Sequence, residues 1–390
     1  MDMFDNISPQ FTLFAMLYGG AVAVSFVLCL YLLLRKSNAI APGITPPARL
    51  RRWAAAFFGV SVLGHLWWYC FLIFSGDIQS MTYVGCVVLD CVVMLTTIFG
   101  TMLAMLQDRK RPLWPFLAAL TPIVILGGLQ IARPSTDFMT PALVYTLAIF
   151  AFFIIYMVVA LRQYGRWLRD NYADLEHKEV WLSQTLLIFF LLLVAIYGFT
   201  TNGPSLFLLR IADFVLFGLL LWRVETLPQL DASSDTGDDT QDEEVDSSAG
   251  KQKRDSSAQK VLVIPPNIDQ LLEKHCEKTE LYLQNDLTLA HLSVAAGINR
   301  AYLSQYFSSQ GMNYNTYINV LRINHFMHLY HEALATRQPY TAQQLALNSG
   351  YRSYSTFSTA FKQRMGQSVT AWMRDAARDM AKETVDNNMD

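Results

Sequence analysis

Long apolar segments alternate with short polar connections throughout residues 1–227. A helix needs about 20 consecutive apolar residues to cross a bilayer, because each residue advances the helix axis by only about 1.5 Å. Seven segments of this chain approach or exceed that length, and they predict a bundle of seven membrane-spanning helices. The segments lie near residues 11–34, 53–74, 83–106, 113–131, 141–161, 180–199 and 205–222.

The basic residues between these segments predict the orientation of the bundle. Lys and Arg are enriched in loops on the cytoplasmic side of a membrane. The second, fourth and sixth connections contain only Arg133, and no Lys or Arg precedes the first segment. We therefore expect the N-terminus outside the cell and the C-terminus in the cytoplasm. The other basic residues lie in the first, third and fifth connections: Arg35, Lys36, Arg49, Arg51, Arg52, Arg109, Lys110, Arg111, Arg162, Arg166, Arg169 and Lys178.

The pattern changes after residue 227, where an acidic stretch replaces the apolar segments. Asp and Glu recur from Asp231 to Asp246, and no Lys or Arg occurs in this stretch before Lys251. With the interspersed Ser, Gly and Thr, this composition cannot bury a core. We therefore expect residues 228–260 to form a disordered, acidic linker.

Helical periodicity returns after Pro266, now with apolar residues on one side of each segment. Residues 267–284 predict one amphipathic helix. A short helix then ends at a turn residue, Gly297, and Asn299 is placed to cap the helix that follows. A long helix from about Asn315 to Leu334 connects this pair to the remaining chain. The apolar positions of the pair are Leu289, Leu292, Ala296, Leu303 and Phe307.

A second pair of helices is predicted between Leu345 and Trp372. Gly350 provides the backbone freedom for a sharp turn, Tyr351 faces inward, and Phe357 and Phe361 lie on one side of the next helix. The opposite face carries hydroxyls and cations: Arg352, Tyr354, Ser355, Thr356, Thr359 and Lys362. A helix that packs by one face and offers such groups on the other suits the major groove of DNA.

The second pair contains the pattern Leu-Ala-x-x-x-Gly-Tyr-x-Ser-x-Ser-x-Phe-x-x-x-Phe-Lys-x-x-x-Gly, from Leu345 to Gly366. This pattern resembles the second helix-turn-helix of AraC-type bacterial transcription regulators. The resemblance covers about residues 267–376, and it implies a cytoplasmic, all-α domain with two helix-turn-helix units that binds double-stranded promoter DNA. The family usually has a proline shortly after the last glycine, which this chain lacks. That difference affects a turn outside the helix that contacts DNA.

The resemblance also implies which residues contact DNA. Outward positions of the first recognition helix would meet base edges (Ala301, Ser304 and Gln305), as would Tyr354, Ser355, Thr356 and Thr359 in the second. Cations at Arg300, Arg352 and Lys362 are expected to contact phosphate, which positions the protein without selecting a sequence.

The charge of this region also fits a DNA-binding domain. Seven Lys and Arg residues, Arg322 among them, lie between Leu287 and Arg374 beside one acid, Glu332. This balance suits phosphate binding, although part of it is also expected of an ordinary solvated surface. The acidic linker could then act as a plain tether, or it could compete with DNA phosphates for this basic domain.

Four ionisable residues in the predicted spans are expected at a similar depth near the outer face: His65, Asp90, Arg210 and Asp213. Charged groups are costly in lipid, so they mark functional sites or ion pairs. Two interpretations remain open. The four residues form a pocket for a signal, or Arg210 forms a salt bridge with Asp213 or Asp90 that specifies helix packing.

Composition supports a membrane protein without catalytic function. Of 390 residues, 53% are hydrophobic and 16% are charged. The hydrophobic share is higher, and the charged share lower, than in a typical soluble protein. No CxxC, HExxH, GxSxG or phosphate-binding glycine loop occurs. We expect no enzyme activity, no cofactor and no metal site.

These features predict a multi-pass transcription regulator of the bacterial inner membrane. Its expected partners are DNA, the lipid bilayer, a second copy of the chain, and a signal that is a small molecule or a membrane protein. One alternative is a transporter or channel whose helix-turn-helix domain is only regulatory, and another is a membrane part that only anchors. The domains are residues 1–227 (spans), 228–260 (linker), 261–376 (DNA binding) and 377–390 (polar tail).

Overall fold

The computed structural model describes residues 9–35, 38–133, 138–176, 178–185, 187–189, 192, 203–230, 267–336 and 338–386. These residues form helices and turns, and no β-strand element occurs among them. The prediction of an all-helical chain is confirmed for this part. The predicted acidic linker lies outside the described residues from position 231 onward.

The chain divides into two compact units, each of which is described by itself. The first unit comprises residues 1–164 and 177–232, and the second comprises residues 165–176 and 233–390. Residues 165–176 therefore group with the C-terminal helices, although they contain the end of α6 (Met139–Asn171). The sequence analysis placed the start of the C-terminal domain at residue 261 and did not include this segment.

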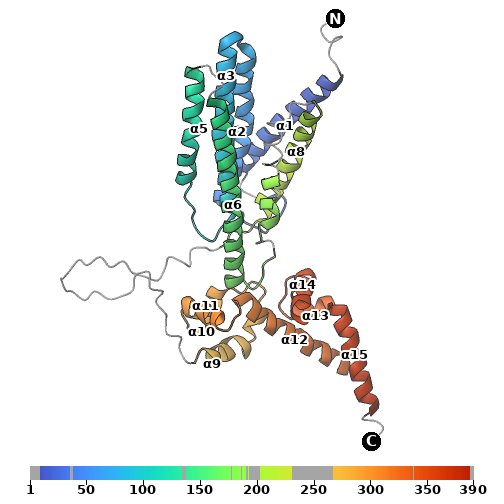
Figure 1. Cartoon of the computed structure of the whole chain (residues 1–390). Coiled ribbons are helices and arrows are strands. Elements are labelled where there is room, and N and C mark those ends of the chain that lie inside the picture. Colours follow the sequence, from blue (N-terminus) through green and yellow to red (C-terminus); the bar gives the residue numbers. More distant parts are fainter. Residues whose placement is uncertain are drawn as a thin grey trace, which may run out of the picture. The chain divides into compact units, whose positions relative to one another are not determined.

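Apolar helices build the first unit (Figure 1). The helix α2 packs against α1, α4 and α8, and α3 packs against α5. A π-helical turn, η1, interrupts the path from α3 to α4. Besides α6, the elements are α1 (Pro9–Leu34), α2 (Ala48–Ile73), α3 (Gly76–Leu89), η1 (Asp90–Met94), α4 (Leu95–Met105), α5 (Trp114–Ala132) and α8 (Gly203–Thr226).

Four helices of the described part are long and apolar enough to cross a membrane: Thr12–Leu34, Gly76–Met105, Trp114–Ala132 and Thr140–Asn171. Their apolar side chains also point away from the protein, as Phe152 and Ile155 of α6 do with exposures of 71% and 63%. A helix that is apolar on its outer side as well as its inner side is typical of a membrane span. The helices α2 and α8 coincide with two further predicted spans, and half of the predicted span 180–199 lies outside the described residues.

Close packing between α2 and α4 depends on a small residue. A Cβ atom added to Gly100 would clash with the ring of Trp53. Small residues allow helices to approach closely where apolar surroundings give no hydrophobic drive for association. Next to this contact, the rings of Phe99 and Phe153 stack with 3.2 Å between their centroids. These contacts fix the arrangement of α2, α4 and α6 within the first unit.

A long helix with further helices before and after it in the chain builds the second unit (Figure 1). The long helix is α12 (Tyr314–Thr336), and its two halves belong to two separate hydrophobic cores. The elements before it are α9 (Ile268–Leu272), η4 (Glu273–Glu277), η5 (Leu281–Leu283), α10 (Leu289–Ala296) and α11 (Arg300–Ser309); those after it are α13 (Ala342–Asn348), α14 (Tyr354–Met365) and α15 (Val369–Asp386).

Two boundaries differ from the sequence-based expectation. The prediction of a single helix over residues 267–284 is wrong. The helix α9 passes into the π-helical turn η4, and Glu280 then adopts a left-handed φ of 55° before η5. This break directs the backbone of residues 281–284 toward α12 and α13, where it forms contacts described below. The helix α15 continues to Asp386, through most of the segment expected to be a polar tail.

Candidate nucleic-acid interface

The first helix pair, α10 and α11, is fixed by its caps and its turn. The hydroxyl of Thr288 accepts a hydrogen bond from the backbone N–H of His291 at 3.1 Å, and the side-chain oxygen of Asn299 accepts one from the backbone N–H of Ala301 at 2.8 Å. Both bonds satisfy N–H groups that a helix leaves free in its first turn. Between the helices Gly297 has a φ of 65°, as the sequence predicted for a turn residue.

The second helix pair, α13 and α14, uses the same devices with an additional constraint. Thr341 and Gln344 form a capping box at the start of α13. At the turn, Gly350 has a φ of 85°, and a Cβ atom there would lie 2.7 Å from the backbone of Leu283. Tyr351 is buried beside it, as predicted. Only glycine fits this turn, because it joins the second pair directly to η5.

A buried arginine connects the two halves of the unit. Arg322 of α12 is 1% exposed, and its guanidinium donates to the carbonyl oxygens of Tyr282, at 2.7 Å, and Gln284. Its Cζ atom lies 5.6 Å from the ring centroid of Tyr351. Burial lowers the pKa of this guanidinium below its usual value. The expectation that Arg322 adds to a phosphate-binding surface is therefore wrong, and its role is structural.

The predicted DNA contacts of α11 occupy its first half. Ala301 is exposed, whereas Ser304 and Gln305 are half-buried. Arg300 donates a hydrogen bond to the Asn171 side-chain oxygen instead of extending freely into solvent. The apolar side of the helix is Leu303 and Phe307, both buried as predicted.

The predicted contacts of α14 form a more open surface. Four of them are exposed: Arg352, Ser355, Thr359 and Lys362. Thr356 is half-buried, and its hydroxyl donates to the Glu176 carboxylate at 3.0 Å. Tyr354 packs against the core that contains Phe357, with 6.0 Å between the ring centroids. The structure thus places Tyr354 partly inward, which the outward assignment from the sequence did not anticipate.

The contacts of Asn171 and Glu176 were not predicted from the sequence. Asn171 is the last residue of the largely apolar helix α6, and Glu176 lies in the short polar connection that follows. No local pattern there indicates packing against helices more than a hundred residues later. The signal that the sequence offered for these contacts was the acidic character of this segment, which could attract a basic domain of the same chain.

The four ionisable residues singled out in the predicted spans divide into two groups in the structure. Arg210 pairs with Asp213 at 2.9 Å, and its Cζ atom lies 5.4 Å from the ring centroid of Tyr18. The Tyr18 hydroxyl forms a hydrogen bond with Nδ1 of His65, so this tyrosine links His65 to the ion pair. Of the two partners considered for Arg210, the structure pairs it with Asp213.

Asp90 forms the second group. Its two carboxylate oxygens accept the indole N–H groups of Trp67, at 2.9 Å, and Trp68, at 2.6 Å. Asp90 is also the first residue of the π-helical turn η1. Such turns are frequent at functional sites, because they shift the direction of one side chain relative to the rest of the helix.

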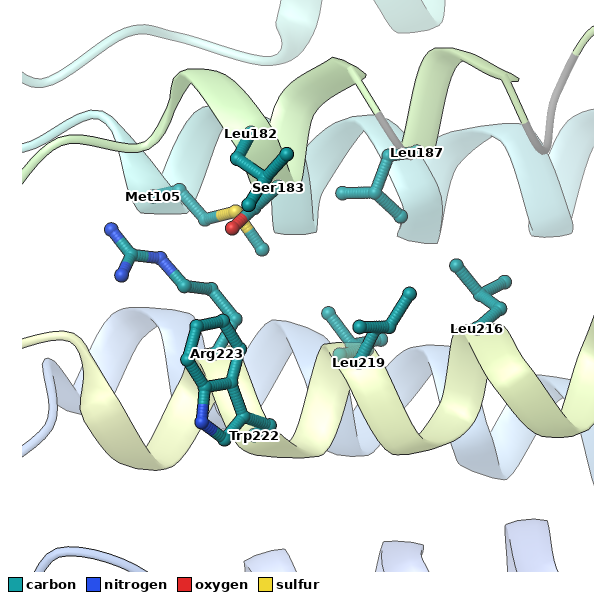
Figure 2. Close-up of a pocket in the computed structure, with 9 residues that line it drawn as sticks. Met105, Leu182, Ser183, Leu187, Leu216, Leu219, Trp222 and Arg223 are labelled. Atoms are coloured by element: carbon teal, nitrogen blue, oxygen red, sulfur yellow. The ribbon is translucent and has the colours of Figure 1, made fainter.

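A small cavity lies elsewhere in the first unit. Its volume is about 40 Å³, and leucines of α8 and of residues 182–187 line it together with Met105 and the side chain of Arg223 (Figure 2). This volume accommodates water but is far below the size of a typical ligand pocket. Arg223 is 4% exposed and donates to the carbonyl oxygen of Glu179, so it has a structural contact here.

Comparison with known proteins identifies one part of the chain. The family model of a helix-turn-helix domain matches residues 292–375, which contain α11 to α14. This match supports the AraC-type DNA-binding domain indicated by the sequence motif. A search of curated proteins and a search of solved structures gave no match for the chain.

Proposed function

We propose that this chain is a membrane-embedded transcription regulator of a bacterium. In this proposal residues 1–227 cross the inner membrane seven times, with the N-terminus outside. Residues 261–376 bind promoter DNA in the cytoplasm through two helix-turn-helix units, α10–α11 and α13–α14. The chain acts by binding and has no enzymatic activity.

The observation that carries the proposal is the exposed polar face of α14 within the region that matches a helix-turn-helix domain. Phe357 and Phe361 are buried on one side of this helix, Thr359 and Lys362 are exposed on the other, and Arg352 is exposed just before the helix begins. Short hydroxyl side chains can approach base edges in a major groove, and flanking cations can bind phosphates on either side.

The membrane assignment is supported by four apolar helices and by the distribution of basic residues along the sequence. We propose that the bundle receives a signal at the group formed by His65, Arg210 and Asp213, with Asp90 as a second polar position. Replacing His65 and the Arg210–Asp213 pair by apolar residues should then leave transcription unresponsive to its signal. An unchanged response would favour a bundle that only anchors the domain.

We further propose that the signal acts through association of two chains. Two linked DNA-binding domains gain affinity from the high effective concentration of the second. Equal affinity of a forced monomer and a forced dimer of the full chain for one promoter would exclude this step.

Genome-wide crosslinking of the full chain to DNA tests the central proposal. The informative variant is Arg352→Ala combined with Lys362→Ala, which removes two exposed cations and leaves the core of α14 intact. A matched control is Lys274→Ala, because this exposed cation lies on η4 and is not part of α11 or α14.

We expect a small number of discrete sites for the wild-type chain and the control, and their loss in the double variant. Neighbouring genes would then indicate what the bundle senses. Diffuse crosslinking that the double variant does not change would contradict the proposal and favour a transporter or channel with a helix-turn-helix domain that does not select DNA sequences.

A further inference from the structure

The segment Asn171–Glu176 is an integral part of the second unit. Ala173 is 3% exposed and belongs to the hydrophobic core of α10 and α11. Its backbone N–H donates to the carbonyl oxygen of Leu287 at 3.3 Å, and Tyr172 forms an antiparallel bridge with Thr288. Backbone pairing and a buried side chain together show that this segment docks at one defined place.

Asn315 at the start of α12 completes the docking. Its side-chain amide donates to the carbonyl oxygens of both Tyr172, at 3.2 Å, and Ala173, at 2.7 Å. A side chain that satisfies two successive carbonyl groups recognises a specific backbone conformation rather than a general apolar surface. The domain therefore contains a built binding site for residues 172 and 173.

The two ends of the docked segment contact two residues predicted to bind DNA. The side-chain oxygen of Asn171 accepts a hydrogen bond from Arg300, the first residue of α11. The carboxylate of Glu176 accepts one from Thr356, at 3.0 Å, in the first turn of α14. The first turns of recognition helices are the parts that contact bases and phosphates in helix-turn-helix complexes.

DNA and this segment cannot use these residues in the same way at the same time. A hydroxyl has a single O–H to donate, so Thr356 cannot donate to Glu176 and to a phosphate or base together. The Glu176 carboxylate would also lie beside DNA phosphates of the same charge, which costs free energy at short distance.

We propose that residues 171–176 are a built-in competitor of DNA: docked, they hold Arg300 and Thr356, and DNA binds fully only after at least the acidic end has left α14. This inference rests on the proposed function. Because the segment follows α6 without a break in the chain, a shift of α6 would move the competitor. The signal would thus reach the DNA-binding surface through residues 171–176, without the acidic linker as an intermediary.

The test compares DNA affinities of the full chain in lipid nanodiscs. The key variant is Asn171→Ala combined with Glu176→Ala, which removes both acceptors and leaves Ala173 and Asn315 in place. The charge-matched control is Glu332→Gln, because Glu332 is an exposed acid of α12 in the same unit. The probe is a fluorescent DNA duplex selected by this double variant from a random-sequence pool.

We expect the double variant to bind the selected duplex about tenfold more tightly than the wild-type chain, a change typical of one lost charge-assisted hydrogen bond. The Glu332→Gln control should differ from wild type by no more than about twofold, since it changes only a distant exposed charge. Hydrogen exchange at the Ala173 amide of the wild-type chain should become faster when the duplex is added.

Three outcomes overturn the inference and separate it from the proposed function. If wild type and double variant bind the duplex with equal affinity and equal sequence selectivity, residues 171–176 do not compete with DNA, but the proposed function as a DNA-binding regulator still holds. An equal gain in Glu332→Gln shows that net charge alone acts. Failure of the double variant to enrich any duplex from the pool contradicts both the inference and the proposed function.

Discussion

The two helix pairs of the second unit share their local design and differ in how exposed the polar faces of α11 and α14 are. Each pair has a capped first helix, a glycine with positive φ at or near the turn and two buried apolar residues on the second helix. The first pair, however, shares its core with Ala173, and Arg300 is already hydrogen-bonded. The second pair exposes cations at both ends of its polar face. The comparison shows that α14 has the more exposed cations beside it, whereas the pair α10–α11 shares more contacts with residues 171–176.

The largest expected effect comes from Gly350→Ala in the turn of the second pair. The substitution combines a left-handed φ with a contact 2.7 Å from the Leu283 backbone, so it should destabilise α13 and α14 by about 3 kcal/mol or more. Hydrogen exchange of the α13 and α14 amides in the full chain measures this change.

The control for this prediction is Gly311→Ala after the first pair. Gly311 has a φ of 68° but no atom within 4 Å of an added Cβ, so it should cost only about 1–2 kcal/mol. Similar losses for the two substitutions would show that the junction between η5 and α13 adds nothing beyond backbone strain.

The next largest effect is expected for Arg322→Met. The buried carbonyl groups of Tyr282 and Gln284 would lose their donor, which costs about 3 kcal/mol in total. Chemical denaturation of the full chain, monitored by the susceptibility of the second unit to proteolysis, would measure this loss of stability. Arg364→Met is the control, because Arg364 is exposed on the last turn of α14. A stable Arg322→Met variant would mean that the two pairs do not depend on this connection.

A smaller and more selective difference is expected between the two recognition helices. Lys362→Ala should weaken DNA binding uniformly and reduce the slope of log affinity against log salt by about one. Gln305→Ala should instead alter the preference at one base pair, by about 1–3 kcal/mol. Binding of both variants to a duplex library at several salt concentrations distinguishes the two roles. If both variants lose affinity equally for all sequences, Gln305 does not select a base.

The smallest effect concerns pH. Burial lowers the pKa of His325 below its usual value near 6.5, His328 lowers it further and Glu280 opposes the shift. The unfolded chain therefore takes up this proton first, so the stability of the second unit should decrease as pH falls below about 6.5. His325→Gln should flatten this decrease in an unfolding series from pH 7.5 to 5.5. A parallel decrease in the variant would assign it to other groups.

Local features of the second unit could be predicted from the sequence. Asn299 and Gly297 act through their nearest neighbours, so their residue types alone indicated a cap and a turn. Phe357 and Phe361 followed from helical spacing. Each of these predictions depends on contacts within about one helical turn of the chain.

Features that depend on distant contacts could not be predicted in the same way. Arg322 resembles any other surface cation on a helix until the carbonyl groups of residues 282 and 284 are known to face it. The break in residues 267–284 follows from those same contacts, and the docking of Ala173 depends on residues far along the sequence. In the first unit, the pairing of Arg210 with Asp213 was one of the alternatives that the sequence left open, and their spacing of three residues on one helix made it possible.

The connection between the two helix pairs has a consequence for the DNA sites that such a protein can use. The 23 residues of α12 extend over about 35 Å, close to the length of one turn of B-DNA. Arg322 and the contact of Gly350 with Leu283 prevent the pairs from shifting along this helix independently. The spacing of the two sequence elements in an operator should therefore be fixed to the base pair. Insertion of about half a helical turn between the elements would place them on opposite faces of the DNA, and one chain could then bind only one of them.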